Sequence, residues 1–176
     1  MNRLLMKIKK GLEKDYYKYW GLRLEELKEK GLKVGQNVHI LDSIVDEGFI
    51  KLIQIGDNVI ITGATILAHD ASTKKFIGYT KCGGVHIGNN VFVGHGAIIL
   101  PNTKIGNNVI IGAGAVVKGD IPDDSVVVGN PMVIIGTVSE NMRKNKELFE
   151  RYGVSNLNDP NDIEKMKDTE YKGFVL

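Results

Sequence analysis

A six-residue repeat in residues 87–122 constrains the fold of this chain more than any other feature. The segment reads IGNNVFVGHGAIILPNTK and then IGNNVIIGAGAVVKGDIP, and an aliphatic residue returns at every sixth position: Ile87, Val93, Ile99, Ile105, Ile111 and Val117. A second, mostly smaller set follows four positions after each of these: Val91, Ala97, Thr103, Val109, Ala115 and Ile121. A period of six matches neither a helix nor a flat strand. It predicts a mainly β fold in which short strands and corners stack coil upon coil, a parallel β-helix.

The repeat extends over residues 34–136, which we expect to form one β-helix domain. Two segments break its rhythm. The run DEGFIKLIQ, residues 46–54, is three residues longer than a repeat unit and predicts a bulge. Residues 73–86 are extra to the repeat and predict an inserted loop. Long loops in compact domains tend to carry function, so the insertion marks the first place to look for a site.

The flanking segments, residues 1–33 and 137–176, follow other patterns. Leucines at helical spacings among charged residues predict one or two amphipathic helices that end at Gly31. Three lysines of this segment are suited to at most a weak contact with an anionic membrane surface: Lys7, Lys9 and Lys10. Thr137 with Glu140 forms a capping-box pattern, which predicts that a helix begins here and that a surface tail follows it.

Charge and cysteine content narrow the function classes. The 176 residues carry a net charge of +2, so no strong positive field indicates a nucleic-acid partner. The single cysteine, Cys82, cannot form a disulfide within the chain and suits a reducing compartment. Neither a secretory signal nor an apolar run long enough to span a membrane is evident. We therefore expect a cytoplasmic protein.

The three sides of the predicted β-helix differ in the residues that should point outward, taken as those just before each inward aliphatic. The first and second sides are mostly apolar: His39, Ile60, Phe92 and Ile110 on one, and Val45, Ile66, Ile98 and Val116 on the other. The third side is more polar, with Ser72, Lys104 and Pro122. Because soluble monomers seldom expose such apolar patches, we expect neighbouring subunits to cover them, in a homotrimer.

One histidine stands out as a catalytic candidate. His69 falls at a corner immediately before the insertion, and an imidazole there is suited to act as a general base near neutral pH. Asp46 and Glu47 lie one coil earlier in the bulge, where stacked strands are about 5 Å apart. Their carboxylates are placed to bind a sugar hydroxyl or to orient the imidazole; an acidic turn without a role is the alternative. His95 is expected at a different corner, above Gly63, and should not meet His69 within one chain.

Four runs carry a resemblance to a known family: ATILAHDAS, VHIGNNVFVGHGAIILPNTKIGNNVIIGAGAVV, DIPDDSVVVGNP and VIIGTV. They resemble the hexapeptide-repeat acyltransferases, and within them the galactoside, maltose and capsular-polysaccharide O-acetyltransferases. The resemblance implies a left-handed β-helix, a trimer with active sites between subunits, and transfer of an acetyl group from acetyl-CoA to a hydroxyl without a metal. It implies that His69 is the catalytic base. It also implies acetyl-CoA contacts at Phe92, His95 and Ala113.

The chain departs from the family at two places. Its lysine in the segment VVKGDIP, Lys118, is displaced by one position, and Met132 and Val133 follow Asn130-Pro131 where a small and a basic residue are common. We expect Lys118 and the basic residues of the last helix to hold the CoA phosphates: Arg143, Lys144 and Lys146.

Other functions remain open at this point. N-acetylation of an amino sugar and O-acetylation of serine or a drug use the same machinery. A β-helix carbonic anhydrase needs three histidines meeting at an interface, and this chain offers His69, His86 and His95 without the usual His-x4-His spacing. A non-catalytic scaffold is the last alternative, and the loop at His69 argues against it.

Overall fold

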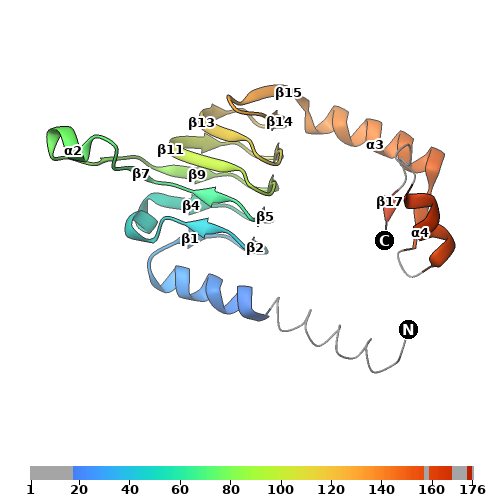
Figure 1. Ribbon diagram of the computed structural model, residues 1–176, viewed down its shortest axis with the longest axis horizontal. Coiled ribbons are helices and arrows are strands. Elements are labelled where there is room, and N and C mark those ends of the chain that lie inside the picture. The colour runs from blue at the N-terminus through green and yellow to red at the C-terminus, as the bar shows by residue number, and fades with distance from the viewer. Residues whose placement is uncertain (1–17, 157–158, 168–173, 176) are drawn as a thin grey trace. The chain divides into compact units, whose positions relative to one another are not determined.

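The computed structural model describes residues 18–156, 159–167 and 174–175. They fall into two compact units, which divide between Ile135 and Gly136. The first unit contains the repeat, wound as a left-handed parallel β-helix of three sides, and Figure 1 shows its coils stacked from β1 upward. None of the helices in the described part of the chain is both long and apolar enough to cross a bilayer.

Each side of the β-helix is a ladder of parallel strands, one from each coil. The first side comprises β2 (Val38–Leu41), β5 (Val59–Thr62), β10 (Val91–Val93), β12 (Val109–Ile111), β14 (Ser125–Val128) and β15 (Val133–Thr137). The second comprises β3 (Ile44–Val45), β6 (Thr65–Ile66) and the first halves of β11 (Ile98–Ile105) and β13 (Val116–Ile121). The third comprises β1 (Lys33–Val34), β4 (Ile53–Ile55), β9 (Val85–Ile87) and the second halves of β11 and β13.

The repeated aliphatic residues form the core, as their spacing predicts. On the first side, Ile61, Val93 and Ile111 stand in register and none of their side chains is exposed. On the third side, Ile55, Ile87 and Ile105 form an equivalent buried stack. Identical or similar side chains therefore pack upon one another from coil to coil, which is why a six-residue repeat can specify the whole interior.

The corner between the third and first sides is nearly the same in every coil, with asparagine in four coils and Asp124 in the last. Asparagines with a left-handed backbone occupy it at φ of 51°, 55°, 55° and 54°: Asn37, Asn58, Asn90 and Asn108. Asparagine tolerates this conformation better than most residues. Each side-chain amide donates to the carbonyl oxygen of the next asparagine, at 3.0, 3.2 and 3.1 Å. Gly88 is required beside this corner, because a Cβ there would lie 2.5 Å from the carbonyl oxygen of Gly106.

The expected outward positions of the second side are wrong in the first two coils. Val45 and Ile66 are buried, with exposures of 5% and 0%, and stand in register with each other, while Ile44 is 64% exposed. The corner before them is one residue shorter than in later coils. Ile66 follows Ile61 by five positions, whereas Ile99 follows Val93 by six. Because the corner is one residue shorter, the residues of the following strand that were expected to face outward face the core.

The third side also differs from expectation. Its outward position in the last coil is held by Asp120, in register with Lys104, whereas Pro122 lies beyond the strand. Ser72 lies outside the β-helix altogether. The insertion begins and ends earlier than expected: His69–Asp70 (β7) and Lys81–Cys82 (β8) pair as an antiparallel stem, and Lys74–Ile77 (α2) lies at the tip. We call residues 69–84 the arm. The stack resumes at Val85, which is fully buried.

The N-terminal helix is described from residue 18 to 29, followed by a turn at Gly31, as expected. Leu27 and Leu32 bury their side chains in the first unit, at 2% and 5% exposure. Lys7, Lys9 and Lys10 lie outside the described residues. The helix is tied to the bulge at the predicted position, where Glu47–Leu52 form the 3-10 helix η1.

The second unit begins with the predicted helix, α3 (Val138–Tyr152). The hydroxyl oxygen of Thr137 accepts a hydrogen bond from the backbone N–H of Glu140 at 3.1 Å, which confirms the cap. Two short strands, β16 (Val154–Ser155) and β17 (Phe174–Val175), pair in parallel, and α4 (Pro160–Met166) lies between them in the sequence.

Candidate active site

His69, at the base of the arm, contacts the carboxylate of Asp46 in the preceding coil. Its Nδ1 lies against Oδ2 of Asp46, and the same oxygen accepts the backbone N–H of Ala68 at 3.0 Å. The Asp46 side chain is 6% exposed and the His69 side chain 33%, so the imidazole alone is open to a substrate. Since a carboxylate only accepts hydrogen bonds, the Nδ1 atom carries the proton. The lone pair on Nε2 is left for a proton transfer.

Phe49 packs flat on the imidazole of His69. The two ring centroids are 4.6 Å apart and the planes differ by 21°. Phe49 belongs to η1, where its φ of −125° interrupts the helical geometry, and its ring contacts His69 of the next coil. The imidazole is thus fixed at its edge by Asp46 and on one face by Phe49. The bulge in the repeat is the sequence signal for this support, although no pattern in the sequence distinguishes Phe49.

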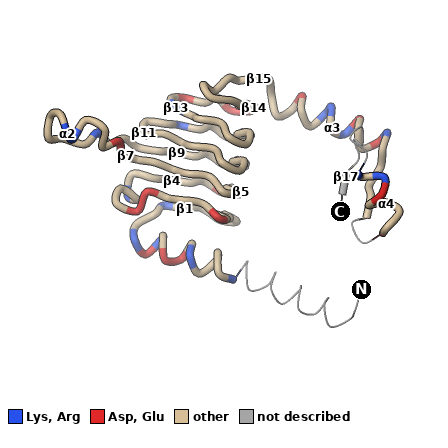
Figure 2. The backbone as a smooth tube through the Cα atoms, viewed as in Figure 1, with Lys and Arg blue, Asp and Glu red and all other residues tan. Residues whose placement is uncertain are grey.

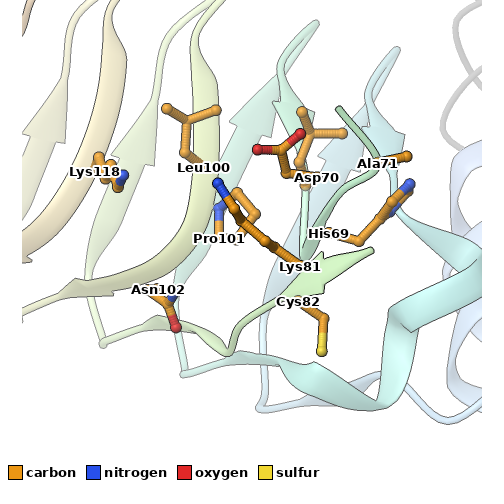
Figure 3. A pocket seen from close by; sticks show the side chains of 10 residues that line it. His69, Asp70, Ala71, Lys81, Cys82, Leu100, Pro101, Asn102 and Lys118 are labelled. Atoms are coloured by element: carbon orange, nitrogen blue, oxygen red, sulfur yellow. The ribbon is translucent and has the colours of Figure 1, made fainter. Parts of the chain in front are cut away.

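A cavity of about 420 Å³ opens beside His69, between the arm and the neighbouring coils (Figure 3). The arm contributes one wall, and the corner that follows the second side contributes the other. The lining residues are Leu67, His69, Asp70, Ala71, Lys81, Cys82, Leu100, Pro101, Asn102 and Lys118. Lys118, the displaced lysine of the sequence analysis, therefore shares a cavity with the candidate base.

The cavity contains charges of both signs. Hydrogen bonds from the Ser72 hydroxyl and the Ser72 backbone N–H lower the pKa of Asp70, and nearby Lys81 adds to this effect. The N–H of Ser72 is 2.9 Å from Oδ1 of Asp70. Asp70 therefore stays ionised at neutral pH, in a cavity that also presents the ammonium groups of Lys81 and Lys118.

Glu47 points away from His69, although Asp46 is its neighbour in the chain. Its carboxylate forms ion pairs with Arg23 and Lys30 of the N-terminal helix, the latter at 2.6 Å. Hydrogen bonds from Lys30 and then Arg23 lower the pKa of Glu47. One of the two adjacent carboxylates thus holds the imidazole, and the other holds the helix.

Of the other three candidate residues, Phe92 lies on the first side, and His95 and Ala113 lie at the corner between the first and second sides. Phe92 lies on the outward face of β10 and is 42% exposed. His95 packs over Gly63 of the preceding coil, where a Cβ would lie 2.0 Å from the imidazole. The N–H of Gly114 donates to the carbonyl oxygen of His95 at 2.9 Å, so Ala113 follows one coil later. None of Phe92, His95 and Ala113 lines the cavity at His69.

The histidines considered for a metal site stand on separate features of one chain. His69 is held by Asp46, His95 stacks on Gly63, and His86 stands outward on the third side between Gln54 and Lys104. Within residues 18–156, 159–167 and 174–175, no three His, Cys, Asp or Glu side chains are grouped to hold a metal ion.

Comparison with known proteins assigns the family. Residues 84–119 match the model of the bacterial transferase hexapeptide, six repeats. CapG of Staphylococcus aureus is 35% identical over 161 residues, with 86% of each chain covered. YvoF of Bacillus subtilis, named as a candidate acetyltransferase, is 38% identical over 121 residues, with 68% of each chain covered. The chain belongs to the hexapeptide-repeat acetyltransferases.

Solved structures agree in fold. A maltose O-acetyltransferase from Clostridium difficile aligns with a TM-score of 0.53 at 30% identity, covering 77% of this chain and 89% of that one. A galactoside acetyltransferase in complex with coenzyme A aligns with a TM-score of 0.56 at 28% identity, covering 64% of this chain and 58% of that one. This chain therefore spans less than two thirds of the galactoside enzyme.

Proposed function

We propose that this protein transfers an acetyl group from acetyl-CoA to a hydroxyl group of a saccharide. The observation that carries the proposal is the imidazole of His69, fixed through Nδ1 by buried Asp46 and open to a cavity at the base of the arm. A general base with a defined tautomer suits the deprotonation of a hydroxyl. Family membership supports the acetyl donor, and the similar galactoside and maltose enzymes support the saccharide acceptor.

The reaction follows from the geometry of His69. Its Nε2 takes the proton from the acceptor hydroxyl as the hydroxyl oxygen attacks the thioester carbonyl carbon. A tetrahedral intermediate forms, whose oxyanion is stabilised by backbone N–H groups. The carbon–sulfur bond then breaks, the protonated imidazole returns its proton to the leaving sulfur, and CoA departs as a thiol. Asp46 holds the ring in position and stabilises the imidazolium while it carries the extra proton.

We assign the complete site to two chains of a homotrimer. The outward faces of the first two sides are largely apolar, with Ile44, Ile60 and Phe92 exposed by 64%, 40% and 42%. A neighbouring chain that covers them would bring its own Phe92, His95 and Ala113 toward the corner that carries His69. Acetyl-CoA would then lie between the two corners, with Lys118 in reach of its anionic groups. We place this reaction in the cytoplasm, where acetyl-CoA is available.

The oligomer is tested by charge placed on the apolar faces. Phe92→Asp and Ile98→Asp should each dissociate the trimer, because a buried unpaired carboxylate is costly to desolvate. Light scattering measures the assembly, and Lys104→Asp on the polar third side is the control that should leave it unchanged. A trimer that survives both apolar-face substitutions contradicts this arrangement.

The activity is tested with purified protein, acetyl-CoA and a panel of acceptors, with release of free thiol as the readout. The panel contains sugars, nucleotide sugars, amino sugars and serine. We expect saccharide-dependent thiol release and an acetyl ester in the product by mass spectrometry. Release of thiol with an amino sugar or serine alone would contradict the proposed acceptor class, and no acetyl-CoA binding by calorimetry would contradict the donor.

A further inference from the structure

The cavity beside His69 contains two lysine side chains that are not paired with a carboxylate. Lys81 belongs to β8 of the arm, and Lys118 belongs to β13. Neither takes part in an ion pair within residues 18–156, 159–167 and 174–175. Figure 3 shows the Lys81 side chain extending from the stem of the arm across the cavity. The cavity therefore offers cationic groups to a ligand.

Among the described residues that line this cavity, Asp70 alone is acidic, and its carboxylate is already engaged. It stands opposite Lys81 in the register of the stem, yet the two side chains form no ion pair. Oδ1 of Asp70 instead accepts the backbone N–H of Ser72 at 2.9 Å, and the Ser72 hydroxyl also donates to the carboxylate. No aspartate or glutamate follows in the arm, and Figure 2 shows basic residues along it. The ammonium group of Lys81 is thus available.

Lys81 lies near the candidate base rather than near the expected position of the CoA phosphates. His69 pairs with Cys82 and Asp70 pairs with Lys81, so the lysine is one position, about 3.3 Å, further along the stem than the imidazole. The thioester of acetyl-CoA must reach Nε2 of His69, and the long pantetheine arm separates that thioester from the phosphates. Lys118 lies two coils beyond His69, about 10 Å away at the usual strand spacing, and is better placed for the phosphates. An anion at Lys81 would therefore belong to the acceptor.

We propose that the acceptor saccharide carries an anionic group, a carboxylate or a phosphate, which Lys81 binds beside the hydroxyl that is acetylated. An ammonium group forms short, strong hydrogen bonds with either anion. The opposite wall suits the sugar ring, because Leu100 and Pro101 are apolar and Asn102 offers an amide. The Asn102 side chain packs against the arm, where a Cβ on Gly83 would overlap its Oδ1 atom. The inference rests on the proposed function of this site and adds the chemical class of its acceptor.

A carboxylate of a neighbouring chain in the trimer is the rival partner for Lys81. The acidic side chains of the bulge and of the corners already interact within their own chain: Asp42, Asp46, Glu47, Asp57, Asp123 and Asp124. Asp120 stands outward on the third side, in register with Lys104, and not on the two sides that we assign to the interface. Pairing with Lys81 across chains would compete with the existing interactions, whereas an anionic ligand brings an uncommitted charge.

The test is binding of glucose, glucuronate and glucose 6-phosphate, and of the galactose form of each, to the full chain with CoA at saturation. Ligand-observed nuclear magnetic resonance titration gives the dissociation constants. We expect an anionic sugar to bind about tenfold or more tightly than its neutral form, as one charge-assisted hydrogen bond provides. The carboxylate and phosphate forms distinguish the two anions. Equal affinities across the panel, no binding of any anionic form, or equally tight binding of inorganic phosphate alone would each overturn the proposal.

Substitutions locate the anion site. Lys81→Gln should lower the affinity for the anionic sugar about tenfold, to that of the neutral form, whereas Lys81→Arg should retain most of it. Lys75→Gln changes a lysine of the same arm outside the cavity lining and should leave the affinity unchanged. In acetyl transfer, Lys81→Gln should raise the KM of the anionic saccharide and leave kcat nearly unchanged, because the contact is equal in the ground and transition states. Discrimination that survives Lys81→Gln, or that is lost in Lys118→Gln instead, overturns the assignment.

Three outcomes separate this proposal from the trimer contact and from the proposed function. Light scattering that shows dissociation of Lys81→Gln, with anion affinity equal to that of the wild type, would assign Lys81 to a neighbouring chain and overturn the proposal. Acetyl transfer with equal kcat/KM for neutral and anionic saccharides would also overturn it and would leave the proposed function standing. Anion binding at Lys81 without acetyl transfer to any saccharide would contradict the proposed function and leave the anion site standing.

Discussion

Two corners of the same β-helix differ in how closely their residues repeat from coil to coil. The asparagine corner (residues 36–37, 57–58, 89–90, 107–108 and 123–124) is nearly identical in each coil, with a ladder of side-chain amides. The His69 corner (residues 46–52, 67–84, 100–102 and 118–119) differs in every coil, with a bulge, an arm, an irregular turn and a lysine. The repeated asparagine corner keeps the spacing between coils regular, whereas the irregular His69 corner forms the cavity beside the imidazole. Substitutions at the asparagine corner should therefore change mainly stability, and substitutions at the His69 corner should change mainly acetyl transfer.

Removing the imidazole should give the largest effect. His69→Ala should lower acetyl transfer by ~10²–10⁴-fold, the usual contribution of a general base, without changing melting temperature or assembly. Turnover with a saccharide acceptor is the measurement. His86→Ala, on the outward face of the third side, is the matched control. A folded His69→Ala protein with wild-type turnover would show that the base lies elsewhere.

Asp46→Asn should have the next largest effect, on the order of 10²-fold in kcat, at the low end of what a general base contributes. An amide can donate to Nδ1, and it then leaves the proton on Nε2, which is the wrong tautomer. Glu47→Gln changes the adjacent carboxylate in the same way, but Glu47 holds the N-terminal helix and not the imidazole. Equal losses of kcat in the two variants would refute the assigned difference between these carboxylates.

Asn90→Ala probes the regular corner and should lower stability without lowering kcat. Asn90 accepts from Asn58 at 3.2 Å and donates to Asn108 at 3.1 Å, with φ of 55°. Losing both bonds and straining a left-handed residue should cost about 2–3 kcal/mol. Asn90→Gly keeps the backbone conformation and removes only the bonds, so it should cost less. Melting curves compare the two, and a larger loss for glycine would contradict the strain argument.

Phe49→Leu should reduce kcat by several fold, roughly threefold to tenfold as an order of magnitude for a misaligned base. The leucine fills the space but lacks the flat face that packs on the imidazole of His69. The pH dependence of kcat separates positioning from structure, since a changed imidazole environment should shift the acidic limb. An unchanged pH profile with a lower melting temperature would make Phe49 a packing residue only.

Lowering the pH should have the smallest effect, a loss of stability where Glu47 of the bulge pairs with the N-terminal helix. Ion pairing holds the pKa of Glu47 below its ordinary value of 4.5. The stabilisation is therefore complete above that value and is lost as pH falls through the lower pKa of the folded state. The melting temperature of wild type should fall more than that of Glu47→Gln between about pH 5 and about pH 3. If the melting temperatures of the two proteins fell equally with pH, these exposed ion pairs would contribute little to stability.

Much of the fold could be predicted from the repeat, and the exceptions have local causes. The phase of six holds from Ile87 to Val117, where each coil has corners of equal length. It fails at Val45 and Ile66 because the preceding corner is one residue short, and a strand shows its other face after a shift of one. The residue types at that corner do not indicate that it is shorter. Asp42 and Gly63 of the shorter corners adopt the same left-handed backbone conformation as Gly96 of the longer one.

The candidate site was predicted in part. A histidine next to an insertion and a carboxylate one coil earlier were visible in the sequence, because stacked coils bring such residues together. Asp46 and Glu47 were equivalent at that level, and only the fold turned one toward His69 and the other toward Lys30. Phe49 went unnoticed, since a single aromatic residue in a bulge has many possible roles.

The sequence by itself determined the β-helix, most of its core, its bulge and the presence of an arm after His69, because these depend on spacing along one chain. Tertiary structure decided which atoms meet at the irregular corner: Asp46 with His69, Phe49 over the ring, and Lys118 beside the arm. Those contacts join residues of different coils, and their side-chain directions depend on corner lengths and on the kink at η1. A repeat fixes the coil that a residue occupies, whereas packing between coils fixes the direction in which its side chain points.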